Sequence, residues 1–320
     1  MGSLTCWVVT DGTLGMEVQC LGLAEALGIE PVVKRLRTRP PWRYLPPRLW
    51  LAPMMALSST SDRLDPPWPD LLIATGRQSV ALSIAVRRRS GGKTFTVQIQ
   101  NPAAALGNFD LVVAPAHDGL SGANVVATRG ALNGVTPEKL AAAAERFGPE
   151  LSHLPRPLVA VLIGGDNKVY RLSAGRMRDL AARLAELVAR YRAGLAVTPS
   201  RRTGAENEAV LREALRSLPA VVWDGTGANP YLGYLALADA IVVTCDSVNM
   251  VSEACATGKP VYVFDLDGGS EKFSRFHERL RRDGLTRPFD GVLAEWRYTP
   301  LDDTARVAEE IHRRMAGRAS

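Results

Sequence analysis

Short apolar runs alternate with longer amphipathic segments along most of this chain. In the first half, four apolar runs have the length of buried parallel strands, and two segments between them repeat apolar residues at helical spacing. The expected strands are 6–10, 71–74, 94–99 and 111–114, and the expected helices are 15–27 and 78–89. A further helix is expected to begin at Thr136, with a proline at its first position. Buried strands that alternate with helices indicate a parallel sheet.

The same alternation resumes after the proline-containing stretch 148–157, which we interpret as a linker. The expected strands are 158–163, 195–198, 221–223, 240–244 and 261–264, and the expected helices are 173–192, 206–218 and 247–257. Two β/α series in succession predict an α/β protein with two doubly wound, Rossmann-like domains facing a cleft, at 1–150 and 151–320. A last helix begins at Thr299-Pro300 and is a candidate to pack back on the first domain.

Composition narrows the class of protein. The chain has 320 residues, 46% of them apolar, and a net charge of +6 spread along its length. The longest basic run, Arg87 to Arg89, has no interleaved aromatic residues, so we do not expect a nucleic-acid partner. The positive surplus instead suits anionic substrates or an acidic membrane surface.

Cysteine and apolar patterns bear on metal binding and location. The four cysteines form no C-x-x-C pair and no metal-ligand spacing with the four histidines, so no metal site is expected. Reduced, buried thiols suit a cytoplasmic protein. No apolar run reaches about 20 residues and no signal-like core opens the chain, so we expect a cytoplasmic protein that contacts the inner membrane at most peripherally.

The segment from Asp246 to Pro260 is the strongest candidate for chemistry. Ser247 is a natural N-cap for a helix that follows an apolar strand, and the free N–H groups of such a helix attract a diphosphate. Asn249 and Met250 share a helix face with Glu253, whose carboxylate is suited to accept hydrogen bonds from ribose hydroxyls. The alternative is an ordinary sheet-packing helix with a polar cap.

Three loops in the second half are expected at the same end of the sheet. They contribute the candidate binding residues Gly164, Gly165, Asn167, Ser200, Arg201, Arg202, Asn229 and Tyr231. Paired arginines beside small hydroxyl residues suit a diphosphate, and the loop before Tyr231 offers a wall for a base. The alternatives are exposed arginines and a plain glycine-rich loop.

In the first half, the loop 11–19 joins the first strand to its helix and places Glu17 near the helix entrance. Its glycines do not follow G-x-G-x-x-G, which argues against a nicotinamide or flavin site. The alternative is a tight connection with solvated polar residues.

Several of these segments together resemble a known family. The matching segments are 7–27, 70–77, 97–118, 124–140, 163–167, 198–204 and 229–264. They resemble the mitochondrial fission proteins named for elongated mitochondria, whose bacterial members are classed as candidate glycosyltransferases. The second half is also similar to the donor-binding domain of GT-B glycosyltransferases. That resemblance implies a nucleotide-sugar site built from Gly165, Arg201, Ser247, Asn249 and Glu253.

The resemblance also directs attention to a catalytic base. Many related GT-B enzymes have histidine after the glycine turn of the first domain, where this chain has Met16. Glu17 is the nearest replacement, and His117 with Asp118 is a second candidate proton acceptor. A structural role in a turn is the alternative for His117.

The segment 40–57 combines aromatic, aliphatic and basic residues with several prolines. It suits a membrane headgroup layer or a lipid-linked acceptor, although its prolines argue against one continuous amphipathic helix. A loop that covers the core is the alternative.

The leading hypothesis is a metal-independent GT-B glycosyltransferase without a cofactor. Its C-terminal domain would hold a nucleotide diphosphate sugar, and its N-terminal domain a cell-envelope glycan or a lipid-linked acceptor. The alternatives are a non-catalytic, membrane-associated adaptor and a nucleotide-sugar epimerase, the latter expected to need nicotinamide.

Overall fold

A computed structural model describes residues 4–319, which form two compact units. The first unit comprises the residues up to Gly134 together with those from Asp302 onward, and the second runs from Val135 to Leu301. The boundary therefore precedes helix α3 (Pro137–Leu151), whereas the sequence pattern suggested a boundary at its end.

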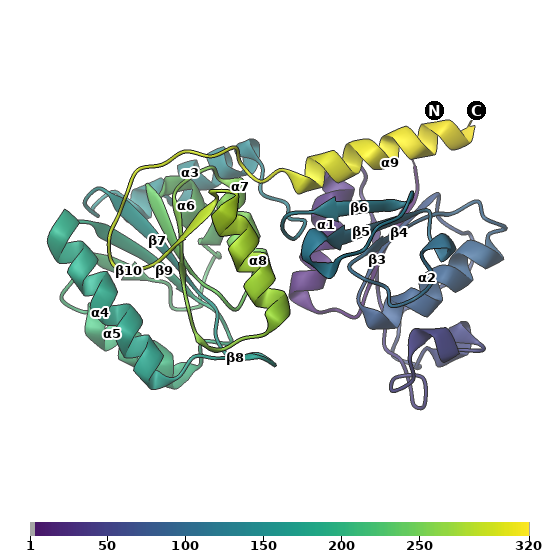
Figure 1. The fold of residues 1–320 in the computed structure, drawn as a ribbon, viewed down its shortest axis with the longest axis horizontal. Helices are drawn as coiled ribbons and strands as arrows, with labels where there is room; N and C mark the ends of the chain where they lie inside the picture. Colours follow the sequence, from purple (N-terminus) through teal and green to yellow (C-terminus); the bar gives the residue numbers. More distant parts are fainter. Residues whose placement is uncertain (1–3, 320) are drawn as a thin grey trace. The chain divides into compact units, whose positions relative to one another are not determined.

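The first unit is built on a six-stranded parallel sheet with strand order β2-β1-β3-β4-β5-β6 (Figure 1). Its strands are β1 (Cys6–Thr10), β2 (Val32–Arg35), β3 (Leu71–Thr75), β4 (Phe95–Ile99), β5 (Leu111–Pro115) and β6 (Val125–Thr128). Its helices are α1 (Leu14–Ala26), α2 (Arg77–Arg89) and α9 (Asp303–Ala319), with short 3-10 turns η1 (Pro47–Leu49), η2 (Pro53–Ala56), η3 (Leu106–Asn108) and η4 (Ala116–Asp118).

Alternate residues of β1 face opposite helical layers of this unit. Cys6 and Val8 pack in one apolar cluster with α1 and α9, whereas Trp7 and Val9 pack in another with α2. All five residues of β1 are buried, as expected for a strand covered on both faces.

Helix α9 belongs to the first unit although it comes last in sequence. Ile311 is fully buried in the same cluster as α1. The carboxylate of Asp303 accepts hydrogen bonds from the backbone N–H groups of Arg129 (2.8 Å) and Gly130 (2.9 Å). These contacts fix the start of the helix to the end of the first sheet.

The second unit has its own six-stranded parallel sheet, with strand order β10-β9-β7-β11-β12-β14. Its strands are β7 (Leu158–Ile163), β9 (Gly194–Pro199), β10 (Ala220–Val222), β11 (Ala240–Thr244), β12 (Val261–Phe264) and β14 (Thr286–Pro288), and a small antiparallel pair joins β8 (Tyr170–Arg171) to β13 (Asp267–Gly268). Besides α3, its helices are α4 (Ala174–Tyr191), α5 (Ala205–Leu215), α6 (Tyr231–Leu237), α7 (Val248–Ala256) and α8 (Glu271–Arg282).

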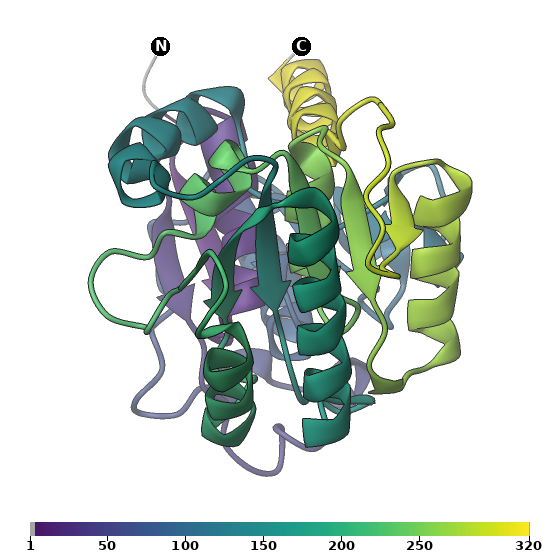
Figure 2. The ribbon, with the colours of Figure 1, turned by 90° about the vertical axis from the view of Figure 1, so that its left-hand side faces the viewer.

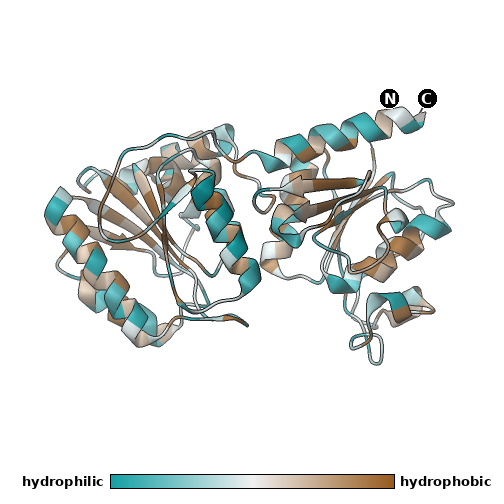
Figure 3. Ribbon diagram, in the orientation of Figure 1, coloured by the Kyte–Doolittle hydropathy of each residue, from teal (hydrophilic) through white to brown (hydrophobic). Residues whose placement is uncertain are grey.

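In chain order, the strands of the second sheet run outward from β7 on one side and then outward from β11 on the other. This is the 3-2-1-4-5-6 order of doubly wound dinucleotide-binding folds. Helices α4 and α5 lie side by side over the sheet (Figures 1 and 2), and the strands carry the apolar positions while the outer helix faces are polar (Figure 3). The α/β, doubly wound prediction is confirmed for both sheets.

The predicted linker differs in part from the structure. Helix α3 continues through Gly148 and Pro149 to Leu151, so only the remainder of 148–157 connects α3 to β7. The helix extends that far because it packs along α6: a side chain at Gly233 would lie 2.6 Å from the ring of Phe147. Among the described residues, no helix has both the length and the apolar character needed to cross a membrane.

Candidate functional site at the strand-order reversal of the second sheet

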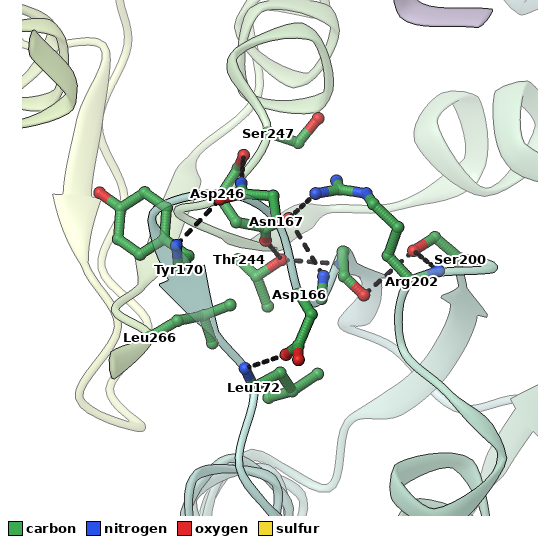
Figure 4. Close-up of polar contacts among 12 residues, drawn as sticks. Asp166, Asn167, Tyr170, Leu172, Ser200, Arg202, Thr244, Asp246, Ser247 and Leu266 are labelled. Atoms are coloured by element: carbon green, nitrogen blue, oxygen red, sulfur yellow. Dashed lines mark hydrogen bonds and ion pairs between the residues drawn. The ribbon is translucent and has the colours of Figure 1, made fainter. Parts of the chain in front are cut away.

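The candidate site lies where β7 and β11 are neighbours and the strand order reverses. Ligands of open parallel sheets bind in the crevice beyond the carboxyl ends of such a strand pair. Gly164 follows β7 directly, and Asp246 and Ser247 follow β11 within three residues. Figure 4 shows Asp246 and Ser247 gathered at that end of the sheet with Ser200 and Arg202 of the loop after β9.

Asp246 is the centre of the polar network (Figure 4). Its side chain is 0% exposed, and its Oδ2 atom lies 2.7 Å from Nη1 of Arg202. The same oxygen accepts the N–H of Gly165 (3.0 Å), and Oδ1 accepts the hydroxyl of Thr244 (2.6 Å). The hydroxyl of Thr244 in turn accepts the N–H of Gly164 (2.8 Å). A buried carboxylate is stable only when it is paired and hydrogen-bonded in this way.

The two glycines are required by this close approach. A Cβ atom at Gly164 would lie 2.2 Å from Oδ2 of Asp246, and one at Gly165 would lie 1.9 Å from the carbonyl oxygen of Arg202. Gly165 also has φ +154°. Any side chain here would therefore push the β7 loop away from Asp246 or from the loop after β9.

The loop after β9 is tied to the same point. The hydroxyls of Ser200 (3.0 Å) and Thr203 (2.7 Å) donate to the carbonyl oxygen of Gly164. These bonds fix the backbone that carries Arg202, whose side chain remains 38% exposed although its guanidinium pairs with Asp246. Arg201 is exposed in the same turn, and its side chain makes no contact with Asp246 like the one that holds Arg202. The geometry thus favours Arg202 over Arg201 as the cation that is held in place.

Asn167 holds the loop after β7 in shape. Its Nδ2 donates to the carbonyl oxygen of Asp246 (3.1 Å), and its Oδ1 accepts the N–H groups of Val169 (2.8 Å) and Tyr170 (2.9 Å). The side chain of Asn167 is therefore engaged by the protein on both of its polar atoms.

Ser247 caps helix α7, as its sequence position predicts. Its side chain accepts a hydrogen bond from the N–H of Met250 at 3.3 Å. The helix has nine residues, so its aligned peptide dipoles place partial positive charge beside the Asp246–Arg202 pair. Asn249 lies in the first turn of this helix, and Met250 packs partly against the core.

Glu253 meets Tyr231 at the start of α6. The hydroxyl of Tyr231 donates to Oε2 of Glu253 at 2.6 Å, and the N–H of Tyr231 donates to Oδ1 of Asn229 at 3.0 Å. Burial raises the pKa of Glu253 to about 7, and the hydrogen bond from Tyr231 offsets only part of that rise. A carboxyl group with a raised pKa is a frequent property of functional sites.

The predicted residues of the second unit thus fall into two hydrogen-bonded groups. The first contains Gly164, Gly165, Asn167, Ser200 and Arg202, and the second contains Asn229, Tyr231 and Glu253. Helix α7 carries both Ser247, beside the first group, and Glu253, in the second.

The central position of Asp246 was not predicted, nor were the roles of Thr244 and Thr203. An available signal was an acidic residue between the end of an apolar strand and an N-cap serine, opposite a Gly-Gly turn. A carboxylate at the end of a strand that is buried on both faces needs a cation or hydrogen-bond donors as partners.

The two catalytic candidates of the first unit do not lie together. Glu17 is in the first turn of α1, after β1, and His117 lies in η4, after β5. Strands β3 and β4 separate β1 from β5, which corresponds to roughly 14 Å at the usual strand spacing.

Each candidate has a charged neighbour. Arg35 donates two hydrogen bonds to Glu17 (2.9 and 2.7 Å), and this contact lowers the pKa of Glu17. The side chains of His117 and Asp118 are 4% and 5% exposed, with 3.7 Å between Nε2 and Oδ1. A lowered pKa makes Glu17 a weaker proton acceptor than an unpaired carboxylate.

No group of three or more potential ligand side chains in residues 4–319 is arranged to hold a metal ion. The four cysteines are buried thiols without disulfide bonds.

Comparison with solved structures confirms the GT-B-like fold. A UDP-GlcNAc 2-epimerase from Methanocaldococcus jannaschii, solved with UDP-GlcNAc and UDP, is similar with a TM-score of 0.55 at 12% identity, covering 97% of this chain and 100% of that chain. A UDP-glucosyltransferase from Polygonum tinctorium gives a TM-score of 0.53 at 13% identity and covers 99% of both chains. At such identities the similarity establishes the fold.

Sequence comparison identifies the family. The "Mitochondrial fission protein ELM1" of Arabidopsis thaliana is 36% identical over 78% of this chain, which spans 65% of the length of that plant protein. An uncharacterized protein of Rickettsia prowazekii is 27% identical, covering 78% of this chain and 81% of its own length. The family model described as "Mitochondrial fission ELM1" matches residues 14–315. The chain belongs to the mitochondrial fission ELM1 family.

Proposed function

We propose that the second unit binds a nucleotide diphosphate sugar and that the protein transfers the sugar to a cell-envelope glycan or a lipid-linked acceptor. The observation that carries this proposal is the Asp246–Arg202 ion pair at the strand-order reversal, beside the N-terminus of α7. The pair holds a half-exposed guanidinium where a diphosphate would meet both a cation and helix N–H groups.

The charge of a departing diphosphate would be stabilised without a metal ion. Arg202 is restrained by Asp246 and by the loop that Ser200 and Thr203 fix to Gly164, so it needs little reorganisation during reaction. Preorganised donors of this kind are a large source of rate acceleration when negative charge develops.

The nucleoside would occupy the Glu253 side of the site. A ribose hydroxyl would donate to the Glu253 carboxylate, which already accepts the hydroxyl of Tyr231. The loop 223–229, which leads to Asn229 and Tyr231, would provide the wall for the base. Asn249 and Met250 flank this position on α7.

The proton acceptor for the incoming hydroxyl remains a choice between His117 and Glu17. His117 is the stronger candidate, because Arg35 lowers the basicity of Glu17. Asp118 would orient the imidazole of His117. In this proposal the first unit supplies the acceptor side, and the protein acts in the cytoplasm at the surface of the inner membrane.

The ligands and activity of the structural neighbours support the substrate class. Proteins of the same fold are solved with UDP-GlcNAc and UDP, and another is a UDP-glucosyltransferase. Because that fold serves epimerases and transferases alike, an altered sugar formed from a nucleotide sugar without any acceptor would favour the epimerase alternative.

Isothermal titration tests the proposal. Uridine, guanosine and adenosine diphosphates and their sugars would be titrated into the protein, and we expect saturable binding of at least one nucleotide at micromolar to millimolar concentration. Arg202→Lys should weaken this binding about tenfold, because lysine keeps the charge but loses the bidentate fork. Arg190→Lys, on the exposed side of α4, is the matched control. Absence of binding to every nucleotide at millimolar concentration would contradict the proposal.

Family membership favours a second candidate, a non-catalytic adaptor that recruits partners at a membrane. Its discriminating test is the double variant Arg202→Lys with Glu253→Gln, in cells that lack the wild-type protein. Retained biological activity would favour the adaptor, and lost activity with normal protein levels would favour the enzyme.

A further inference from the structure

The first unit contains a cavity of about 860 Å³ remote in sequence from the nucleotide site. Its walls come from the segment 47–55, from α2 and from the loop 103–108. Figure 1 shows the first of these segments, in purple, beside α2, and the 3-10 turns η1 and η2 both pack against that helix. The volume falls within the range of small-molecule sites, about 300–1,000 Å³.

Most of the residues that line the cavity are apolar, and some of them are large side chains exposed at its mouth. Trp50, Met54 and Ile84 contribute to the lining. Leu51 is 100% exposed and Met55 is 59% exposed. Single exposed leucines are ordinary, but exposed apolar side chains that gather at the mouth of one cavity indicate a binding surface.

The polar part of this surface is basic. Arg48, Arg88 and Arg89 line the cavity, and no Asp or Glu does so. Within residues 4–319, none of these three arginines forms an ion pair, whereas the adjacent Arg87 pairs with Asp110. Arg88 and Arg89 end α2, where the helix dipole favours cations, but Arg48 comes from a separate segment and adds its charge to the same rim.

We propose that this cavity docks the protein on an anionic phospholipid bilayer. The residues that carry the docking are Arg48, Trp50, Leu51, Met54, Arg88 and Arg89. One hydrocarbon chain of a lipid enters the cavity, the arginines contact phosphate groups, and Leu51 and Met55 enter the interfacial layer. The inference does not depend on the function proposed for the second unit, because it concerns residues of the first unit alone.

The positive charge at the rim of the cavity favours an anionic phospholipid as its ligand. A cavity lined mainly by apolar residues, with three unpaired guanidinium groups at its rim, fits an amphiphile whose head is an anion. Each such arginine near an anionic surface adds about 1 kcal/mol of attraction. Stable peripheral binding to a membrane needs both electrostatic attraction and apolar insertion. The arginines at the rim supply the first, and the exposed aliphatic side chains supply the second.

Vesicle flotation with the full chain tests the proposal. We expect the protein to float with phosphatidylcholine vesicles that contain phosphatidylglycerol and to remain largely unbound with phosphatidylcholine alone. Arg88→Glu with Arg89→Glu should lower the partition coefficient at least about tenfold. Arg178→Glu with Arg190→Glu makes the same charge change on exposed positions of α4 and should have a much smaller effect.

A second pair of variants tests how much the exposed apolar side chains contribute to vesicle binding. Leu51→Asp should also weaken binding at least about tenfold, whereas Leu4→Asp, at another exposed leucine of the first unit, should not. Both leucines are exposed, so loss of folding does not account for a difference between them.

A lipid brominated in its acyl chain gives a local readout, because bromine quenches nearby tryptophan fluorescence. Wild-type protein should lose more fluorescence than Trp50→Phe on binding such vesicles. The proposal is overturned if the wild-type protein does not bind anionic vesicles, or if the Arg178 and Arg190 variant loses as much binding as the Arg88 and Arg89 variant. It is also overturned if Trp50→Phe is quenched as strongly as the wild type.

Discussion

The hydroxyl of Tyr231 donates a 2.6 Å hydrogen bond to the carboxylate of Glu253, which joins the start of α6 to the second turn of α7. Burial raises the pKa of this carboxyl to about 7, so its charge changes within the physiological range. A ribose hydroxyl that donates to Glu253 would favour the charged form. Nucleotide binding should therefore depend on pH in a defined direction.

We predict that affinity for a nucleotide sugar rises with pH between pH 6 and pH 8. The binding-competent carboxylate increases from about one tenth to about nine tenths of the population, so the Kd should fall about tenfold. UDP-glucose is the suitable probe because its esterified diphosphate does not titrate in this range. The Kd of Glu253→Gln should be nearly independent of pH, and an equally steep dependence in that variant would assign the effect to another group.

The same carboxyl should make the wild-type fold less stable at higher pH. Its folded pKa lies above the usual value of 4.5, so the native state holds the proton more tightly and loses this stabilisation as pH rises through 7. Glutamine keeps an acceptor for Tyr231 but carries no charge. Urea denaturation should show Glu253→Gln more stable than wild type by roughly 1–3 kcal/mol at pH 8 and nearly equal to it at pH 4, below the usual pKa of the unfolded carboxyl. A variant less stable at pH 8 would contradict the burial of this charge.

Asp246→Asn should weaken both folding and nucleotide binding. The substitution leaves Arg202 without its counter-charge, at a cost of roughly 1–3 kcal/mol given the partial exposure of the arginine. Affinity for a nucleotide should fall at least about tenfold because Arg202 is no longer held. Glu213→Gln, at an exposed carboxylate of α5 that lies 3.7 Å from Arg216, should change stability by less than about 0.5 kcal/mol. Equal effects of the two substitutions would remove Asp246 from the centre of the site.

Gly165→Ala should destabilise the second unit severely. Its Cβ would stand 1.9 Å from a backbone oxygen of the loop after β9, which cannot move without breaking the Gly164 contacts. We expect a loss of more than about 3 kcal/mol, read from thermal denaturation. Gly148→Ala, in α3 with no atom within 4 Å of the new Cβ, should instead stabilise by about 0.5–1 kcal/mol.

If the protein is a transferase with His117 as proton acceptor, His117→Gln should lower kcat by about 10²–10⁴-fold. The Kd of the nucleotide should stay within twofold, because the nucleotide site is assigned to other residues. Glu17→Gln should affect kcat less, since Arg35 already lowers the basicity of Glu17. The reverse order of effects would assign the base to Glu17.

Much of the fold follows from local sequence pattern. Strands such as β1 and β11 are apolar at all or nearly all positions because both faces are covered, and Ser247 and Thr136 cap helices where their sequence positions predict. The end of α3 was not predictable in this way. Gly148-Pro149 has the composition of a break, and the packing of Phe147 on Gly233, far away in sequence, keeps the segment helical.

The sequence predicted several residues of the candidate site, but not which of them pair with one another. Gly164, Arg202 and Ser247 were expected at one sheet edge because parallel strands align their carboxyl ends. Two features depend on which neighbouring side chain turns inward: the choice of Arg202 over Arg201, and the place of Asp246 between Arg202 and Gly165. Sequence periodicity does not predict which of two adjacent residues in a turn points inward, because a turn has no repeating pattern of buried positions.

Hydrogen exchange of the full chain with and without a nucleoside diphosphate tests the central claim most directly, because it locates binding. We predict slower exchange in peptides covering 164–167, 200–203 and 247–250, with little change in the first sheet. Protection confined to other segments, or no protection at saturating nucleotide, would contradict a diphosphate site at the β7–β11 reversal.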